Sequence, residues 1–220
     1  MLGAHFRLPI EFDLTATFLM AMTGVWAAHR RGYDAVGAFT LAFLSGVGGG
    51  LLRDSIFLVR SPAVMQDRRY LWAVLAAFLV GGLVYRFAQR FERLIAYVDA
   101  LAIGVYAVVG ADKAIEAGIS LLGSLIVGMV NAVGGGLLRD IFVREEPLMF
   151  KPGQLYVLAA LAGCVLFVML SSEYGMAVQE AAWIAIAATL LLRVLAISFN
   201  WTTVAGSHLK IRIGKRQDKE

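Results

Sequence analysis

The sequence contains few of the residues that build catalytic and metal centres. Its single cysteine, Cys164, excludes a disulfide framework and a thiolate metal site. The three histidines, His5, His29 and His208, are scattered without metal-ligand spacing, so we expect no structural metal. No nucleophile with a neighbouring base and no carboxylate pair for acid–base work is recognisable. We therefore expect no catalytic residues and no enzyme activity.

Charged residues are also scarce. They make up 16% of the 220 residues, against about 25% in a typical soluble domain, while 60% are hydrophobic and the mean hydropathy is +0.74. This composition indicates a membrane protein. The alternating pattern of a membrane β-barrel is absent, so we expect an all-α polytopic fold. The net charge of +4 comes from basic residues between apolar runs, and nucleic-acid binding is not expected.

The apolar runs predict seven transmembrane helices in a single membrane domain, residues 1–220. Each helix needs about 20 residues to cross the hydrocarbon core. The predicted spans are residues 12–29, 34–59, 70–88, 97–112, 116–143, 154–171 and 178–199, followed by a basic tail at 200–220. The first run is flanked by acidic residues and lacks the basic start of a signal peptide, so we expect it to be retained.

One stretch occurs twice: residues 48–54 and 134–140 both read Gly-Gly-Gly-Leu-Leu-Arg-Asp. The second copy lies 86 positions after the first, and the same offset joins Asp13 to Asp99. We infer two repeats of three spans, at residues 12–88 and 97–171, and a seventh helix without a counterpart. Because three is an odd number, the second repeat must insert upside down relative to the first.

The distribution of lysine and arginine favours an N-terminus outside and a C-terminus in the cytoplasm. The inner segments then carry Arg30, Arg31, Arg86, Arg90, Arg93, Arg144, Lys151 and the basic residues of the tail, against Arg7, Arg60, Arg68, Arg69 and Lys113 outside. We expect a multi-pass protein of the cell (inner) membrane, with membrane lipids as partners. We expect the tail to be a solvated segment that faces the lipid. Specific recognition of an anionic lipid is the alternative.

The glycine triplets suggest where a solute would pass. Each glycine is about 1 kcal/mol less favourable in a helix than alanine. We therefore expect the second and fifth spans to be broken, by a bend or unwinding, at Gly48, Gly49 and Gly50 and at Gly134, Gly135 and Gly136. Freed backbone groups need protein or water as partners, so the triplets should line a polar pathway with the equivalent residues Ser45 and Asn131. A dinucleotide-binding loop does not fit, because no strand precedes the glycines.

The doubled motif also places four charges within apolar spans: Arg53, Asp54, Arg139 and Asp140. Such residues are costly in the membrane, by at least about 2.5–3.5 kcal/mol each, and usually mark a pathway. Because adjacent helical residues do not face each other, the inverted symmetry predicts the cross pairs Arg53–Asp140 and Asp54–Arg139. The four could also join the two halves, and the two roles are compatible.

Asp13 and Asp99 each open an apolar run. A carboxylate there can satisfy the free N–H groups of the first helical turn, so we predict that both cap helices.

The two inverted three-span repeats, the seventh span and the doubled motif resemble the prokaryotic members of the trimeric intracellular cation (TRIC) channel family. These are grouped with bacterial membrane proteins described as glycine transporters. The resemblance covers about residues 12–200. It implies a homotrimer with one potassium-permeable pore in each protomer along the second and fifth spans. It implies no cofactor beyond the transported potassium or sodium ions and, at most, a bound lipid.

The motif is specific to the superfamily and does not distinguish a channel from a carrier. In a channel, carbonyls and the C-terminal ends of half-helices would replace the hydration of monovalent cations. In a carrier, N-terminal ends of half-helices would face the carboxylate of a small zwitterion such as glycine. The channel is our main expectation, although the four motif charges sum to zero and do not by themselves select cations.

Overall fold

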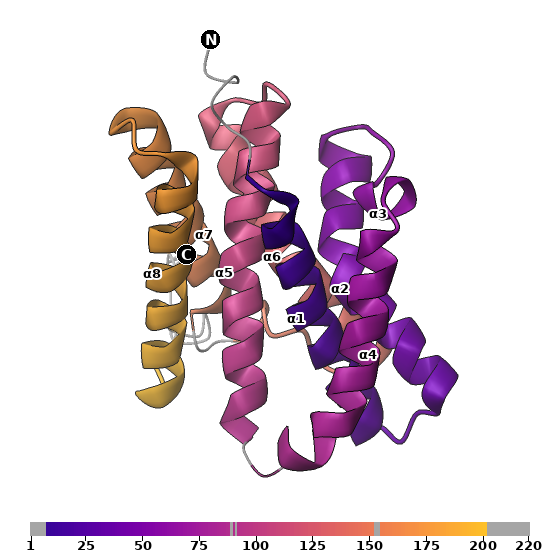
Figure 1. Ribbon diagram of the computed structural model, residues 1–220. Helices are drawn as coiled ribbons and strands as arrows, with labels where there is room; N and C mark the ends of the chain where they lie inside the picture. The colour runs from indigo at the N-terminus through magenta and orange to yellow at the C-terminus, as the bar shows by residue number, and fades with distance from the viewer. Residues whose placement is uncertain (1–7, 89, 91, 152–154, 202–220) are drawn as a thin grey trace, which may run out of the picture.

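The computed structural model describes residues 8–88, 90, 92–151 and 155–201. Every regular element in this part of the chain is helical (Figure 1). The long helices are α1 (Ile10–Arg30), α2 (Ala35–Leu52), α4 (Arg69–Ala88), α5 (Glu92–Glu116), α6 (Leu121–Phe142), α7 (Tyr156–Val168) and α8 (Val178–Ser198). The π-helix η1 (Arg53–Phe57) continues α2, η2 (Met169–Glu173) continues α7, and α3 (Ala63–Gln66) is a single turn. The all-α expectation is confirmed.

Six of the helical segments in the described residues are long and apolar enough to cross a membrane, and α1 is the long helix outside that set. α1 has 21 residues but carries Glu11 and Asp13, and most of its length is buried by its neighbours. Large apolar side chains on the other helices are exposed, among them Leu83, Leu122 and Leu191. Surfaces of this kind suit contact with lipid. The protein is a multi-pass membrane protein.

The inverted repeats are visible in the course of the helices. α1 and its counterpart α5 run in opposite directions at the centre of the molecule (Figure 1), and they pack against each other. α1 also packs on α2 and α4, as α5 does on α6 and α7, while α2 and α6 form the second contact between the repeats. The seventh long helix, α8, packs on α5 and α7.

Both repeats turn into their second helix through the same local pattern. Gly32 and Gly118 have φ angles of +70° and +80°, in the left-handed region that favours glycine. Asp34 and Ser120 then cap α2 and α6, each accepting the backbone N–H three residues on, at 2.8 and 3.2 Å. Both pairs are 86 residues apart, so the repeat extends to the details of its turns.

α5 is longer than predicted. It runs from Glu92 to Glu116 instead of 97–112, and α6 starts at Leu121 instead of 116. Asp99, Asp112 and Lys113 lie inside α5, where each hydrogen-bonds to another segment of the chain. A charged residue that has a hydrogen-bond partner elsewhere in the fold can lie inside a helix. The boundaries inferred from charged residues therefore made the predicted helix too short.

The predicted breaks at the glycine triplets are not found there. α2 stays α-helical through its triplet to Leu52 and changes to π geometry only at Arg53, and α6 stays α-helical to Phe142. The prediction was wrong about the triplet positions because it considered helix propensity without packing.

Close contact between α2 and α6 explains the glycines. A Cβ atom added to Gly49 would lie 2.2 Å from the carbonyl oxygen of Asn131. By the same symmetry, one added to Gly135 would lie 2.2 Å from the carbonyl oxygen of Ser45. Small residues let two helices approach backbone to backbone, and this packing offsets their low helix propensity. We call this contact the glycine crossing.

Candidate functional site

The first copy of the motif ends in a buried ion-pair cluster. Arg53 is 1% exposed, and its Nε and Nη2 donate to the carboxylate of Asp54 at 2.9 and 3.0 Å. Nη2 also lies 3.5 Å from Oδ2 of Asp13, and Nη1 donates to Oδ1 of Asn131 at 3.3 Å. Two carboxylates and an amide thus surround the guanidinium, which is the condition for keeping its charge in a membrane interior.

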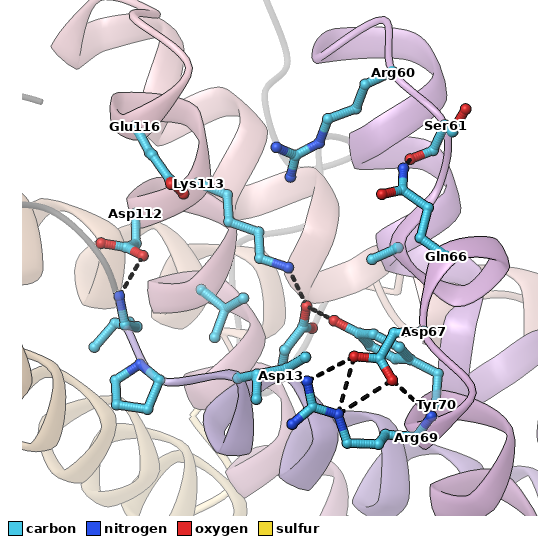
Figure 2. Close-up of a pocket in the computed structure, with 15 residues that line it drawn as sticks. Asp13, Arg60, Ser61, Gln66, Asp67, Arg69, Tyr70, Asp112, Lys113 and Glu116 are labelled. Carbon is cyan, nitrogen blue, oxygen red and sulfur yellow. Dashed lines mark hydrogen bonds and ion pairs between the residues drawn. The ribbon is translucent and has the colours of Figure 1, made fainter.

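Asp13 makes no cap hydrogen bond at the start of α1, so its predicted role was wrong. Its Oδ2 accepts a hydrogen bond from the hydroxyl of Tyr70 at 2.7 Å and another from the ammonium of Lys113. Figure 2 shows Lys113 and Tyr70 reaching this carboxylate from opposite sides. Asp13, on α1, therefore joins η1, α4 and α5 through Arg53, Tyr70 and Lys113.

Asp54 fixes the chain that follows the motif. Its Oδ2 accepts the backbone N–H of Ala63 at 3.0 Å, and its Oδ1 accepts from Arg60 at 3.2 and 3.3 Å. These contacts tie the start of η1 to the start of α3.

The second copy of the motif builds a matching cluster. Nε of Arg139 donates to Asp140 at 2.9 Å, and Nη1 donates to Asp99 and to Thr23, both at 2.8 Å. Asp140 in turn accepts the backbone N–H of Leu148 at 3.1 Å. Asp99, like Asp13, is an ion-pair partner rather than a helix cap, since it lies well inside α5. Each motif arginine therefore binds the aspartate that opens its own repeat.

The predicted cross pairs do not form. Arg53 pairs with Asp54 and Asp13, and Arg139 pairs with Asp140 and Asp99. α2 and α6 run in opposite directions, so the ends that carry the two motifs lie on opposite sides of the glycine crossing. In addition, each arginine is long enough to fold back onto the next residue, a contact that the rule for helix faces does not anticipate.

Ser45 and Asn131 are both fully buried at the glycine crossing. Oγ of Ser45 donates to the carbonyl of Leu41 in its own helix at 2.6 Å. Nδ2 of Asn131 donates to the carbonyl of Tyr106 at 2.7 Å. The structure therefore brings both next to the triplets, and Asn131 also contacts Arg53 of the first cluster.

A cavity of about 680 Å³ opens beside the first cluster, and we call it the first cavity (Figure 2). Its charged lining residues are Asp13, Arg60, Asp67, Arg69, Asp112, Lys113 and Glu116. At its rim, hydrogen bonds from Arg69 hold the pKa of Asp67 below its usual range. A narrow space of about 10 Å³, lined by Thr17, Gly50, Arg53 and Tyr106 among others, lies deeper.

A second cavity of about 200 Å³ lies beside the second cluster. Its charged lining residues are Arg30, Asp99, Arg139, Asp140, Glu145, Glu146, Lys151 and Arg193. Between the two cavities, the backbones of the glycine crossing are in contact and Ser45, Asn131 and Arg53 are buried. The structure is therefore closed at the crossing.

Sequence reasoning missed several residues of these clusters. Tyr70 was not singled out as a site residue and Lys113 was considered only as a basic residue of an outer segment, yet both bind Asp13. A signal was available for the tyrosine, because Tyr156 lies 86 positions later and is also buried. Arg193, fully buried on α8, lies 4.9 Å above the ring of Tyr156.

The model of the glycine transporter family matches the chain twice, at residues 11–88 and 96–172. The chain belongs to this family. A UPF0126 membrane protein of Deinococcus radiodurans is 38% identical over 153 residues, which are 69% of this chain and 71% of that protein. The UPF0126 inner membrane protein YadS of Escherichia coli K12 is 26% identical over 194 residues, 86% of this chain and 91% of YadS.

Solved structures also resemble the fold. The TRIC trimeric intracellular cation channel orthologue of Rhodobacter sphaeroides superposes with a TM-score of 0.81 at 28% identity, covering 86% of this chain and 97% of that chain. A second structure, from work on conductance through TRIC cation channels, gives a TM-score of 0.77 at 27% identity, covering 90% and 97%. The resemblance to the bacterial TRIC family is confirmed.

Proposed function

We propose that the protein is a channel for monovalent cations, permeable to potassium, whose pathway in each protomer runs along α2 and α6. The observation that carries this proposal is the pair of cavities at opposite ends of the glycine crossing, each ending at a motif Arg–Asp cluster. The likeness to TRIC cation channels supports the same function.

Conduction requires the crossing to open. The triplets Gly48–Gly50 and Gly134–Gly136 hold no side chains that would have to move, and the change from α to π geometry at Arg53 gives α2 a place to bend. Arg53 and Asp54 would then border the widened passage from one side, and Arg139 and Asp140 from the other. Ser45 and Asn131 would supply polar groups between them.

We also propose an oligomeric state and a membrane for the protein. The Rhodobacter sphaeroides protein is described as trimeric, and we propose a homotrimer. YadS is described as an inner membrane protein, and we propose the same membrane for this chain. With the N-terminus outside, the first cavity faces the exterior and the second faces the cytoplasm. The basic tail, a candidate for lipid contact, lies beyond Trp201 and outside the described residues.

A carrier for glycine or another small zwitterion is the second candidate. The description of the family favours it, and so does the chemistry of the clusters, because paired arginine and aspartate side chains could bind the carboxylate and the ammonium of an amino acid.

Purified protein in planar bilayers separates the two candidates. A potassium chloride gradient should give unitary currents that reverse close to the potassium equilibrium potential. Reversal near the chloride potential would contradict cation selectivity. Saturable glycine uptake into proteoliposomes without unitary currents would establish the carrier instead.

A further inference from the structure

The two cavities differ in charge at equivalent positions. Asp112 and Glu116 line the first cavity on α5, and the positions 86 residues earlier, on α1, are Trp26 and Arg30. Arg30 lines the second cavity, so an acid in one cavity corresponds to a base in the other. Asp112, whose equivalent is Trp26, has no charged counterpart in the second cavity.

At one other pair of equivalent positions, the signs of the charges are reversed. Arg60 lines the first cavity, whereas Glu146 lines the second. The guanidinium of Arg60 is, however, bound to the buried carboxylate of Asp54 at 3.2 Å. Arg60 is thus held at Asp54, a carboxylate that it shares with Arg53, and no ion pair found in the described residues joins it to Asp112.

The other cations of the first cavity are also bound to carboxylates. Arg69 pairs with Asp67 at 2.7 Å, and Lys113 pairs with Asp13. Each of the three cations of this cavity is thus bound to a carboxylate, although Asp13 and Asp54 also pair with Arg53, and none of the ion pairs found in the described residues includes Asp112.

Asp112 has little to stabilise its charge. It is 2% exposed, and its Oδ2 accepts the backbone N–H of Leu8 at 3.0 Å. Its Oδ1 is buried without a hydrogen-bond partner among the described residues. A buried carboxylate oxygen in this state is costly unless a cation or water reaches it.

We propose that Asp112 binds a monovalent inorganic cation in the first cavity, with Oδ1 as the protein ligand and water completing the coordination. This inference deepens the proposed function, on which it rests. The described residues contain no group of three or more His, Cys, Asp or Glu side chains placed to hold a metal ion. A single carboxylate beside a cavity of about 680 Å³ suits a weakly held, hydrated monovalent ion better than a divalent one. Such a site raises the local cation concentration at the mouth.

The electrostatic potential in the first cavity can be measured by thiol labelling, without recording an ion current. Ser61 is exposed and lines the first cavity on the side across from Asp112 (Figure 2), so Ser61→Cys gives a reactive thiol that senses the potential in this cavity, while the native Cys164 is fully buried. The labelling rates of a cationic and an anionic methanethiosulfonate of similar size are compared at low ionic strength. Asp112→Asn should lower the ratio of cationic to anionic rate by about twofold or more, and Asp112→Glu should preserve it. In 1 M salt, where the screening length is about 3 Å, the difference should fade.

The matched control removes a carboxylate from the opposite end of the protein. Glu145→Gln, in the second cavity, changes the net charge by the same amount and should leave the ratio at Ser61→Cys unchanged. An unchanged ratio in Asp112→Asn would mean that the carboxyl is uncharged or shielded, and would overturn the proposal. So would an equal fall in both variants.

Ion competition distinguishes a binding site from a diffuse electrostatic field, and its first measurement is made with Asp112 intact. Potassium should slow the cationic reagent at Ser61→Cys more than the bulky N-methylglucamine does at the same ionic strength, and Asp112→Asn should remove this difference. Equal slowing by both ions would refute a binding site. If these results hold but bilayers carry no cation current, the cation site stands and the channel proposal fails. Cation currents without potassium-specific slowing would support the channel and refute the site at Asp112.

Discussion

Gly49 lies so close to Asn131 that a methyl group on Gly49 would be 2.2 Å from the backbone carbonyl oxygen of Asn131. Gly135 stands in the same relation to Ser45. The triplets therefore bring α2 and α6 into backbone contact, and the charged motif residues are carried to either side of that contact. Any passage through the protomer has to separate these two helices.

Alanine at the contact should destabilise the protein. Gly49→Ala and Gly135→Ala each force the backbones apart, and we expect a loss of at least about 1–3 kcal/mol per substitution, the usual cost of overpacking. Gly50→Ala is the matched control, because its nearest neighbour would be Nη2 of Arg53 at an ordinary 3.5 Å. Unfolding of the purified variants in detergent measures the difference. Equal stability of Gly49→Ala and Gly50→Ala would contradict the close crossing.

The ion pairs should couple within each repeat and not between repeats. Asp13→Asn leaves Arg53 with one carboxylate fewer in a buried site, and we expect a cost of about 3–5 kcal/mol. A double-mutant cycle of Arg53→Gln with Asp13→Asn should show a clear coupling energy. The cycle of Arg53→Gln with Asp140→Asn should be additive within about 0.5 kcal/mol. Coupling only in the second cycle would mean that the pairing described above is wrong.

The two equivalent tyrosines should respond differently to loss of the hydroxyl. Tyr70→Phe removes a 2.7 Å hydrogen bond to Asp13, at a cost of about 1.5–3 kcal/mol for a bond to a charged group. The hydroxyl of Tyr156 is buried and has no hydrogen-bond partner in the described residues, so Tyr156→Phe should be close to neutral. Both variants are compared by the same unfolding assay, and a larger loss for Tyr156→Phe would contradict the assignment.

The exposed contact between the repeats should matter little for stability. Arg31 pairs with Glu145 at 2.8 Å, and both side chains are about two-fifths exposed, at 40% and 41%. Surface pairs contribute about 0–1 kcal/mol and are screened by salt. Glu145→Gln should therefore shift the unfolding midpoint slightly at low salt and not at all at high salt. A large, salt-independent shift would show that this pair holds the repeats together.

The sequence predicted the architecture well because the duplication is explicit. The repeat of 86 positions identified the equivalent helices, and the odd number of spans required inversion, as α1 and α5 show. Low charge and long apolar runs predicted all six helices that are apolar and long enough to span a membrane, and also α1, which is not among them. The repeat and the apolar runs can be recognised in the sequence without knowing how the helices pack.

The details of the site were harder to predict because they depend on contacts between helices. Glycine was interpreted through helix propensity, whereas at Gly49 and Gly135 packing decides its role. Asp13 resembled a cap because it opens an apolar run, and only the fold brings Arg53, Tyr70 and Lys113 to it. The role of the motif residues in conduction stays a prediction.

The most direct test of the account is the single-channel potassium current through Gly50→Cys before and after a cationic thiol reagent. Gly50 lines the narrow space next to Arg53, has room for a side chain, and lies on the proposed pathway. Leu83→Cys, on an exposed face of α4, is the matched control. The account predicts that labelling at position 50 reduces the unitary current and that labelling at position 83 does not. Full labelling at position 50 with an unchanged current would contradict a pathway along α2 and α6.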